Sequence, residues 1–139
     1  MVQLIVGKKG KGKTKLLLDK VNTSVKEISG NIVYLDKSTK HMYELNNKVR
    51  LVDVSEYFLG STDAFLGFVT GIISQDHDLQ QMYFDSFLKI SCLEGQDITE
   101  AINKLEEIGT RFNVDFVLSV SLDEVELPEA VRSKIIISL

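Results

Sequence analysis

The stretch Gln3-Leu-Ile-Val-Gly-Lys-Lys-Gly-Lys-Gly-Lys-Thr14 decides the fold, because it joins a strand to a helix through a glycine-rich loop. Residues 3–6 form a short, mostly apolar run that is typical of a buried strand. From about Lys13 to Ile28, apolar residues recur at helical spacing, and Gly30 follows as a helix stop signal. Between the two elements, Gly7 to Thr14 matches the pattern G-x-x-x-x-G-K-[ST] without a mismatch.

The chemistry of this loop favours the binding of phosphate groups. Glycines at positions 7, 10 and 12 allow backbone angles that are closed to other residues, so successive N–H groups can turn inward around phosphate oxygens. The N-terminus of the following helix adds the positive end of its dipole. Lys13 can then reach the β- and γ-phosphates of a nucleotide, and the Thr14 hydroxyl can ligate Mg²⁺. The predicted phosphate-binding residues are Gly7, Lys8, Lys9, Gly10, Lys11, Gly12, Lys13, Thr14 and Lys15.

The rest of the chain alternates apolar runs with helical patterns, which predicts an α/β fold with a mostly parallel sheet. Further strands are expected at 31–36, 49–54, 82–84, 115–122 and 135–139, and helices at 63–74 and 98–112. The second of these helices is preceded by the capping-box pattern Asp97-Ile-Thr-Glu100. Because 139 residues is the size of one domain, we expect residues 1–139 to form a single nucleotide-binding domain.

The composition excludes several classes of protein. With 44% hydrophobic residues, 26% charged residues and one Pro, the chain is typical of a globular protein and not of a disordered or fibrous one. Cys92 is the only cysteine, which excludes an internal disulfide and a cysteine-based zinc site. The first residues lack the features of a secretory signal, so a cytoplasmic location is expected. The weakly polar stretch 57–74 contains Gly60-Ser-Thr-Asp63, so we expect a buried helix there and no membrane span.

Charge is distributed unevenly along the chain. Up to Arg50 there are 11 Lys and Arg against 4 Asp and Glu, a net charge of +7, whereas the remainder has 5 against 16, a net charge of −11. A basic first part fits a phosphate-containing ligand, because positive charge steers polyanions toward it. The overall net charge of −4 gives no strong signal for binding nucleic acid.

With a strand before it and a helix after it, the loop resembles the Walker A loop of the P-loop NTPases, and the chain resembles their RecA-like and AAA-type branch. The resemblance implies a three-layer α/β/α core, with a mostly parallel sheet of five or slightly more strands and the loop strand at its centre. It also implies the binding of ATP, or another nucleoside triphosphate, with Mg²⁺. In this branch an Mg²⁺-organising aspartate ends a later strand, and Met82-Tyr-Phe-Asp85-Ser86 is similar to that Walker B strand. Asp53, at the end of the run that starts at Val49, is the alternative.

The same resemblance implies roles for three further residues. RecA-like proteins offer a catalytic base at the end of the second strand, where Asp36 stands. A polar residue on the strand 115–122 commonly senses the γ-phosphate or its water in this branch, a role that fits Ser119 or Ser121. AAA-type proteins present an arginine finger to a neighbouring subunit just before the last strand, where Arg132 stands. A homo-oligomer or a protein partner is therefore expected.

Two positions differ from the patterns of related families. Ser86 follows Asp85 where AAA-type proteins commonly place a glutamate, so rapid hydrolysis is not expected. Lys8 lies five residues before Lys13, which is the spacing of the signature lysine in MinD and ParA-type dimers. However, Lys9 replaces the glycine of that pattern.

The leading hypothesis is a Mg-ATP-binding P-loop protein that hydrolyses ATP slowly and is stimulated by self-assembly or by a partner. The alternative is an interaction module gated by the bound nucleotide, without significant turnover. A small-molecule kinase is the third hypothesis, which the presence of only three arginines disfavours. The chain also resembles small bacterial P-loop proteins labelled as the twitching-motility retraction ATPase. Further acidic and histidine motifs of that motor are absent, so the motor function is not carried over.

Overall fold

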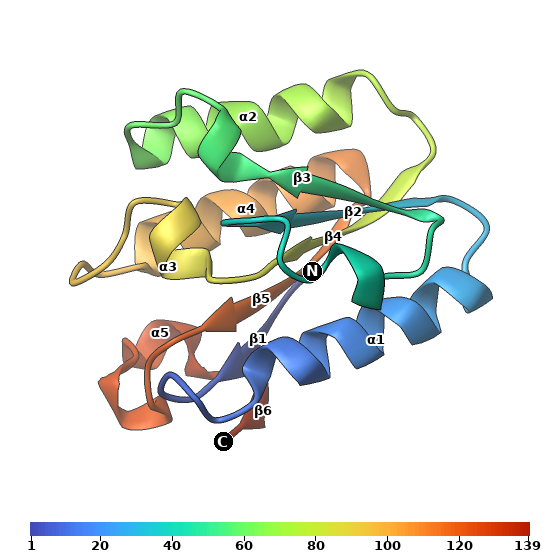
Figure 1. Cartoon of the computed structure of the whole chain (residues 1–139). Helices are drawn as coiled ribbons and strands as arrows, with labels where there is room; N and C mark the ends of the chain where they lie inside the picture. Colours follow the sequence, from blue (N-terminus) through green and yellow to red (C-terminus); the bar gives the residue numbers. More distant parts are fainter.

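Figure 1 shows the computed structural model of the chain, which describes all residues from Met1 to Leu139. The strands are β1 (Val2–Val6), β2 (Asn31–Asp36), β3 (Val49–Asp53), β4 (Leu79–Phe84), β5 (Asp115–Val120) and β6 (Ile135–Ser138). The helices are α1 (Lys13–Glu27), α2 (Thr62–Ser74), α3 (Phe87–Ile90), α4 (Thr99–Phe112) and α5 (Glu129–Arg132). Short 3₁₀ turns cover Met42–Glu44, Val54–Glu56 and Glu124–Glu126.

The six strands form one sheet in the order β3-β2-β4-β5-β1-β6, and all of its pairs are parallel. The predicted α/β class with a parallel sheet is thereby confirmed. The position expected for the loop strand is wrong, because β1 lies between β5 and the edge strand β6 and not at the centre. The chain places β2 and β3 beyond β4, so β4 and β5 form the middle of the sheet.

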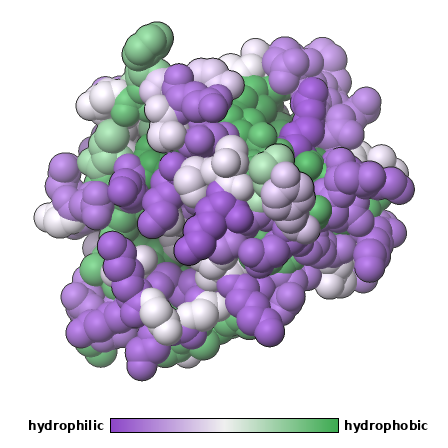
Figure 2. All heavy atoms as spheres, in the orientation of Figure 1, coloured by the Kyte–Doolittle hydropathy of each residue, from purple (hydrophilic) through white to green (hydrophobic).

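Helices cover both faces of the sheet and complete the three layers (Figure 1). On one face, Leu17 of α1 packs in a buried cluster with Tyr34 of β2. On the other face, Phe65 of α2 and Ile102 of α4 share a larger cluster with Leu35 of β2. Successive side chains of a strand point to opposite faces, so each strand supplies both clusters. With these residues inside, hydrophilic side chains form most of the surface seen in Figure 2.

The weakly polar stretch forms α2 and the turn before it. The Ser61 hydroxyl accepts the N–H of Ala64 and caps the helix, while Phe65, Val69 and Ile73 are buried. None of the helices combines the length and the apolar character that crossing a bilayer requires. The structure therefore agrees with the predicted buried helix.

The start of α4 differs from the predicted capping box. The Asp97 carboxylate accepts the N–H of Thr99 at 2.8 Å, and no side chain caps the helix. Ile98, the residue before the helix, already has helix-like angles of −96° and −1°. The carboxylate therefore stabilises a turn that precedes the helix.

Candidate functional site

The loop between β1 and α1 has the backbone that its glycines predict. Gly10 and Gly12 have φ angles of +83° and +95°, which residues with a Cβ rarely adopt. Gly12 precedes α1, and no side chain caps this helix. Because the first N–H groups of an α-helix have no partner within it, those of α1 are available to an anion.

Lys13 is buried at the start of α1. Its Nζ donates a hydrogen bond of 3.0 Å to the carbonyl oxygen of Lys8, which folds the amine back onto the loop. Burial lowers the pKa of Lys13, and the nearby charge of Asp85 opposes that shift. An anion that bound beside this amine would stabilise its charged form.

Asp85 lies at the carboxyl end of β4 and accepts hydrogen bonds from four donors. Its Oδ1 accepts the Ser119 hydroxyl at 2.6 Å, the Ser86 N–H at 2.9 Å and the Thr14 hydroxyl at 3.2 Å. Its Oδ2 accepts the Tyr34 hydroxyl at 3.0 Å. The donors come from four different segments of the chain, so the carboxylate is held in one orientation at their meeting point.

Tyr34 is a site residue that the sequence analysis missed. Its side chain is fully buried, with its ring stacked on that of Tyr83 at a centroid distance of 6.3 Å. Burial and the charge of Asp85 raise the pKa of the Tyr34 hydroxyl, so it remains protonated and can donate to the carboxylate. A signal was present, since Tyr34 stands two residues before Asp36 and alternate residues of a strand share a face.

Asp36 lies beside Asp85, because the preceding residues Leu35 and Phe84 are paired across β2 and β4. Only 2% of Asp36 is exposed. Its Oδ1 accepts the N–H of Lys37 at 2.7 Å, whereas its buried Oδ2 has no hydrogen-bond partner. Burial raises the pKa of Asp36, and the negative charge of Asp85 raises it further. The unpartnered oxygen of this carboxylate is buried beneath the surface.

Lys13, Thr14 and Asp85 border a cleft of about 550 Å³ at the carboxyl edge of the sheet, where ligands of open α/β folds bind. Its lining consists of Lys9, Gly10, Gly12, Lys13, Thr14, Lys37, Lys40, His41, Asp85, Ser86, Ser119 and Ser121, none of them hydrophobic. The structure thus brings the predicted loop, the end of β4 and the end of β5 together. Lys37, Lys40 and His41 were not predicted, because their aperiodic segment carries no sequence motif.

Several predicted residues lie outside this lining, and the buried Asp36 is one of them. The Lys8 amine pairs with Asp123 at 3.4 Å. Lys11 and Lys15 are exposed, and Gly7 packs against Leu139.

Arg132 also lies away from the cleft lining. Its Nε and one terminal nitrogen donate to the carbonyl oxygens of Leu127 and Val125, each at 3.1 Å. The guanidinium therefore holds the turn that precedes α5 in its own chain.

Asp53, the alternative to Asp85, ends the edge strand β3. Its carboxylate accepts the N–H and the hydroxyl of Ser55. Because β2 separates β3 from β4, Asp85 and not Asp53 is the aspartate that meets Thr14.

The donor set at the cleft fits Mg²⁺. This ion prefers oxygen ligands, keeps several waters and is commonly held by one or two carboxylates together with substrate phosphates. The Thr14 hydroxyl and the Asp85 carboxylate supply oxygens of this kind side by side. No group of three or more His, Cys, Asp and Glu side chains is placed to hold a metal ion alone, so the phosphates of a ligand would have to complete the coordination.

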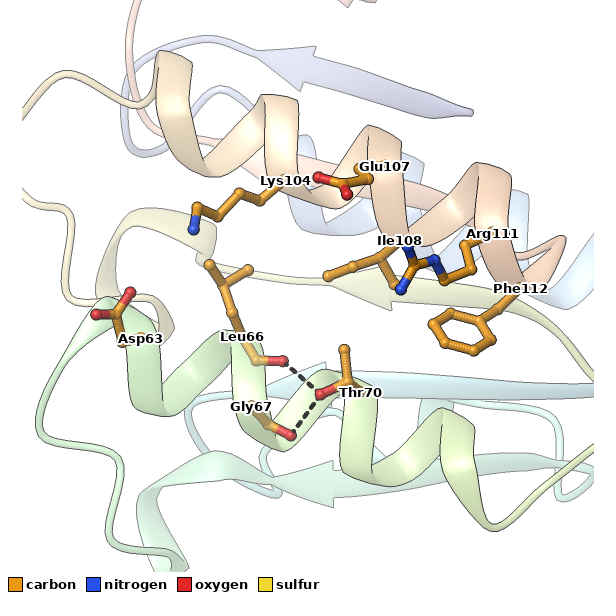
Figure 3. Close-up of a pocket in the computed structure, with 9 residues that line it drawn as sticks. All are labelled: Asp63, Leu66, Gly67, Thr70, Lys104, Glu107, Ile108, Arg111 and Phe112. Atoms are coloured by element: carbon orange, nitrogen blue, oxygen red, sulfur yellow. Dashed lines mark hydrogen bonds between the residues drawn. The ribbon is translucent and has the colours of Figure 1, made fainter.

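A second concave surface lies between α2 and α4, on the face of the sheet opposite to α1. Figure 3 shows this groove of about 430 Å³, into which Leu66, Ile108 and Phe112 point among charged side chains. The Thr70 hydroxyl is bonded to carbonyl oxygens of its own helix. The groove shares no lining residue with the cleft.

Neither a family model nor a curated protein matches the chain. Among solved structures, the chain is similar to a KaiC-like protein from the hyperthermophilic archaeon Pyrococcus horikoshii. The two are 18% identical, with a TM-score of 0.66, over 95% of this chain and 67% of that one. The chain therefore has the RecA-like α/β fold of that protein, with a six-stranded parallel sheet flanked by helices.

Proposed function

We propose that this chain binds a nucleoside triphosphate such as ATP together with Mg²⁺ and hydrolyses it slowly. The observation that carries the proposal is the distance of 3.2 Å between the Thr14 hydroxyl and the Asp85 carboxylate. This contact brings together two parts of a nucleotide site. One is the end of a glycine loop that lies between a strand and a helix, and the other is an aspartate that directly follows a strand. The RecA-like fold of the chain is compatible with this function.

In this proposal the loop N–H groups and Lys13 bind the phosphates, while Thr14 and Asp85 hold Mg²⁺, Asp85 through water. When bound, Mg²⁺ supplies positive charge that offsets the negative charge developing on the phosphate oxygens. Ser119 and Tyr34 keep Asp85 oriented through the hydrogen bonds described above. Lys13 exchanges its bond with the Lys8 carbonyl for contacts with phosphate oxygens.

Asp36 is the proposed base for hydrolysis. In that step a water oxygen bonds to the γ-phosphorus, the bond from this phosphorus to the β,γ-bridging oxygen breaks, and the proton of the water passes to Asp36. The unpartnered Oδ2 and the raised pKa of Asp36 support this role. Because Oδ2 is buried and Asp36 does not line the cleft, the role requires this oxygen to become accessible to the attacking water.

Two features support a slow rate. Ser86 follows Asp85, so the chain lacks a glutamate at the position directly after the proposed metal ligand. Arg132 is engaged with carbonyl oxygens of its own chain, so a role as a finger toward a neighbouring subunit requires those two bonds to open. The position of Ser86 also favours the alternative, a module whose output is the nucleotide-bound state.

Calorimetric titration with Mg-ATP tests the binding proposal, using the wild type, Lys13→Ala and the control Lys26→Ala at the other end of α1. We expect binding by the wild type and the control, and at least about tenfold weaker binding by Lys13→Ala. Phosphate release on the same samples separates the two functions. Multiple turnovers support a hydrolase, whereas binding without release supports the gated module, and no binding by the wild type contradicts both.

A further inference from the structure

The cleft has a second basic wall opposite the glycine loop. It is formed by Lys37, Lys40 and His41, which follow directly after β2. Local hydrogen bonds fix this segment, since Asp36 accepts the N–H of Lys37 and the Ser38 hydroxyl accepts the N–H of Lys40. These bonds give the wall a defined backbone.

Lys9 on the glycine loop and Lys37 and Lys40 on the second wall are free to bind a ligand. The ion pairs of the chain involve Lys8, Lys134, Arg50, His41 and the N-terminus, so Lys9, Lys37 and Lys40 have no acidic partner. Four lysines line the cleft against a single lining carboxylate, that of Asp85. This excess of positive charge on both sides is complementary to a polyanion.

The same lining offers little to a nucleotide base. Bases gain affinity from stacking and apolar contact, and sites selective for one base add hydrogen bonds matched to its edge. No hydrophobic residue lines the cleft. Its only ring, the imidazole of His41, is bonded to the Glu44 carboxylate at 3.1 Å. The most exposed aromatic side chains, Tyr43 and Phe58, are not part of the lining.

We infer that the cleft recognises the triphosphate group itself, so that nucleoside triphosphates bind regardless of their base and inorganic tripolyphosphate occupies the same site. This inference rests on the proposed function and names its substrate class. Lys37 and Lys40 act as a second set of phosphate contacts opposite the loop. The base and the ribose lie outside the selective part of the site.

The test is a calorimetric titration of the full chain with Mg-ATP, Mg-GTP, Mg-CTP and Mg-tripolyphosphate at one Mg²⁺ concentration. We expect dissociation constants for the three nucleotides within about threefold of one another, and tripolyphosphate within about tenfold of them. The affinities for ATP and tripolyphosphate should fall with added salt at a similar slope, because screening weakens the same ion pairs. Lys13→Ala should lower the affinity for both ATP and tripolyphosphate, because both are expected to bind at the same site.

The second wall is tested with the double variant Lys37→Ala/Lys40→Ala. Its affinity for each of the four ligands should fall by the same factor, about three- to tenfold, as expected for exposed charges. Lys48→Ala is the matched control, because Lys48 is an exposed lysine of the same β2–β3 connection that does not line the cleft. Its affinities should equal those of the wild type.

The results that overturn this inference differ from those that overturn the proposed function. Recognition by the phosphates alone is contradicted if ATP binds at least about tenfold more tightly than GTP, or if tripolyphosphate does not bind. Either result is still consistent with a protein that binds nucleotides. Equal affinities of the double variant and the wild type contradict the role of the second wall. If none of the four ligands binds, the proposed function itself is wrong.

Discussion

The hydroxyl of Thr14 lies 3.2 Å from Oδ1 of Asp85, although the two residues are 71 positions apart in the sequence. Thr14 stands in the first turn of α1, and Asp85 follows β4 directly. Since β5 lies between β1 and β4, the contact spans the width of a strand at the carboxyl edge of the sheet. The proposed Mg²⁺ site depends on this contact and on the residues that hold Asp85 in place.

Tyr34→Phe removes the only donor to Oδ2 of Asp85 while keeping the ring that stacks on Tyr83. Because the carboxylate is buried, we expect the free energy of unfolding to fall by about 1–3 kcal/mol. We also expect ATP binding to require a higher Mg²⁺ concentration, because Asp85 is held less firmly. Urea unfolding and a Mg²⁺ titration at fixed ATP measure the two effects.

Tyr83→Phe is the matched control for that variant. The Tyr83 hydroxyl bonds Ser24 and Gln81, not Asp85, so its loss should lower stability without changing the Mg²⁺ requirement. An unchanged Mg²⁺ requirement in Tyr34→Phe would show that Tyr34 is only a structural residue.

The sequence predicted those parts of the site that depend on local signals. Three signals within 28 residues identify the loop and α1. They are the apolar run before the loop, the spacing of its glycines, and the apolar residues that recur at helical spacing after it. Asp85 and Ser119 were reached through the resemblance of their strands to those of known proteins. The hydrogen bond of 2.6 Å between them depends on β4 and β5 being neighbours.

Strand order and the second wall could not be predicted in this way. The position of β1 beside the edge strand results from competition among all strand pairings, which no local pattern encodes. Tyr34 resembles any core aromatic residue until its hydroxyl is placed near Asp85. Lys37 and Lys40 resemble solvated surface lysines until the loop and the end of β2 face each other across the cleft.

Asp36→Asn should change how stability depends on pH. Burial and the charge of Asp85 raise the pKa of Asp36 in the folded chain, so ionisation costs stability. For the wild type this cost is absent below the ordinary Asp pKa of about 4, grows as pH rises through the raised pKa and is then fully present. Asn carries no charge, so the variant should be more stable than the wild type at neutral pH, and the difference should shrink toward acid.

Chemical unfolding of both proteins between pH 4 and pH 8 measures this difference. The same variant should lose phosphate release, because the proposed base is gone. Parallel stability profiles would contradict the raised pKa, and unchanged phosphate release would remove Asp36 from the hydrolytic step.

Arg132→Ala tests whether a neighbouring chain completes the site. We expect a loss of stability of about 1 kcal/mol, since two hydrogen bonds to carbonyl oxygens disappear. If Arg132 acts on a neighbour, phosphate release per chain should rise with protein concentration in the wild type but not in the variant. Mixing Arg132→Ala with Lys13→Ala should restore part of the activity, because one chain keeps a complete loop and the other keeps the arginine.

Arg111→Ala on α4 is the control for that mixture. Arg111 lines the groove between α2 and α4, so its variant should behave as the wild type in phosphate release. Failure of the mixed variants to restore activity would contradict a role of Arg132 in trans.

Gly71→Ala should stabilise α2. A Cβ at this exposed helical position meets no atom within 4 Å, so alanine gains helix propensity without a clash. We expect the free energy of unfolding to rise by about 0.5–1 kcal/mol in urea unfolding. Gly30→Ala is the contrasting variant, because its Cβ would collide with the carbonyl oxygen of Asp78. A destabilised Gly71→Ala would contradict an open environment at this position of α2.

The Mg²⁺ dependence of ATP binding tests the central claim most directly. ATP affinity is measured for the wild type and Asp85→Asn, each with Mg²⁺ and with the metal chelated. If Thr14 and Asp85 hold the ion, Mg²⁺ should strengthen ATP binding by the wild type by about tenfold or more and have little effect on the variant. An equal gain in both proteins, or no gain in the wild type, would contradict a Mg-nucleotide site at Thr14 and Asp85.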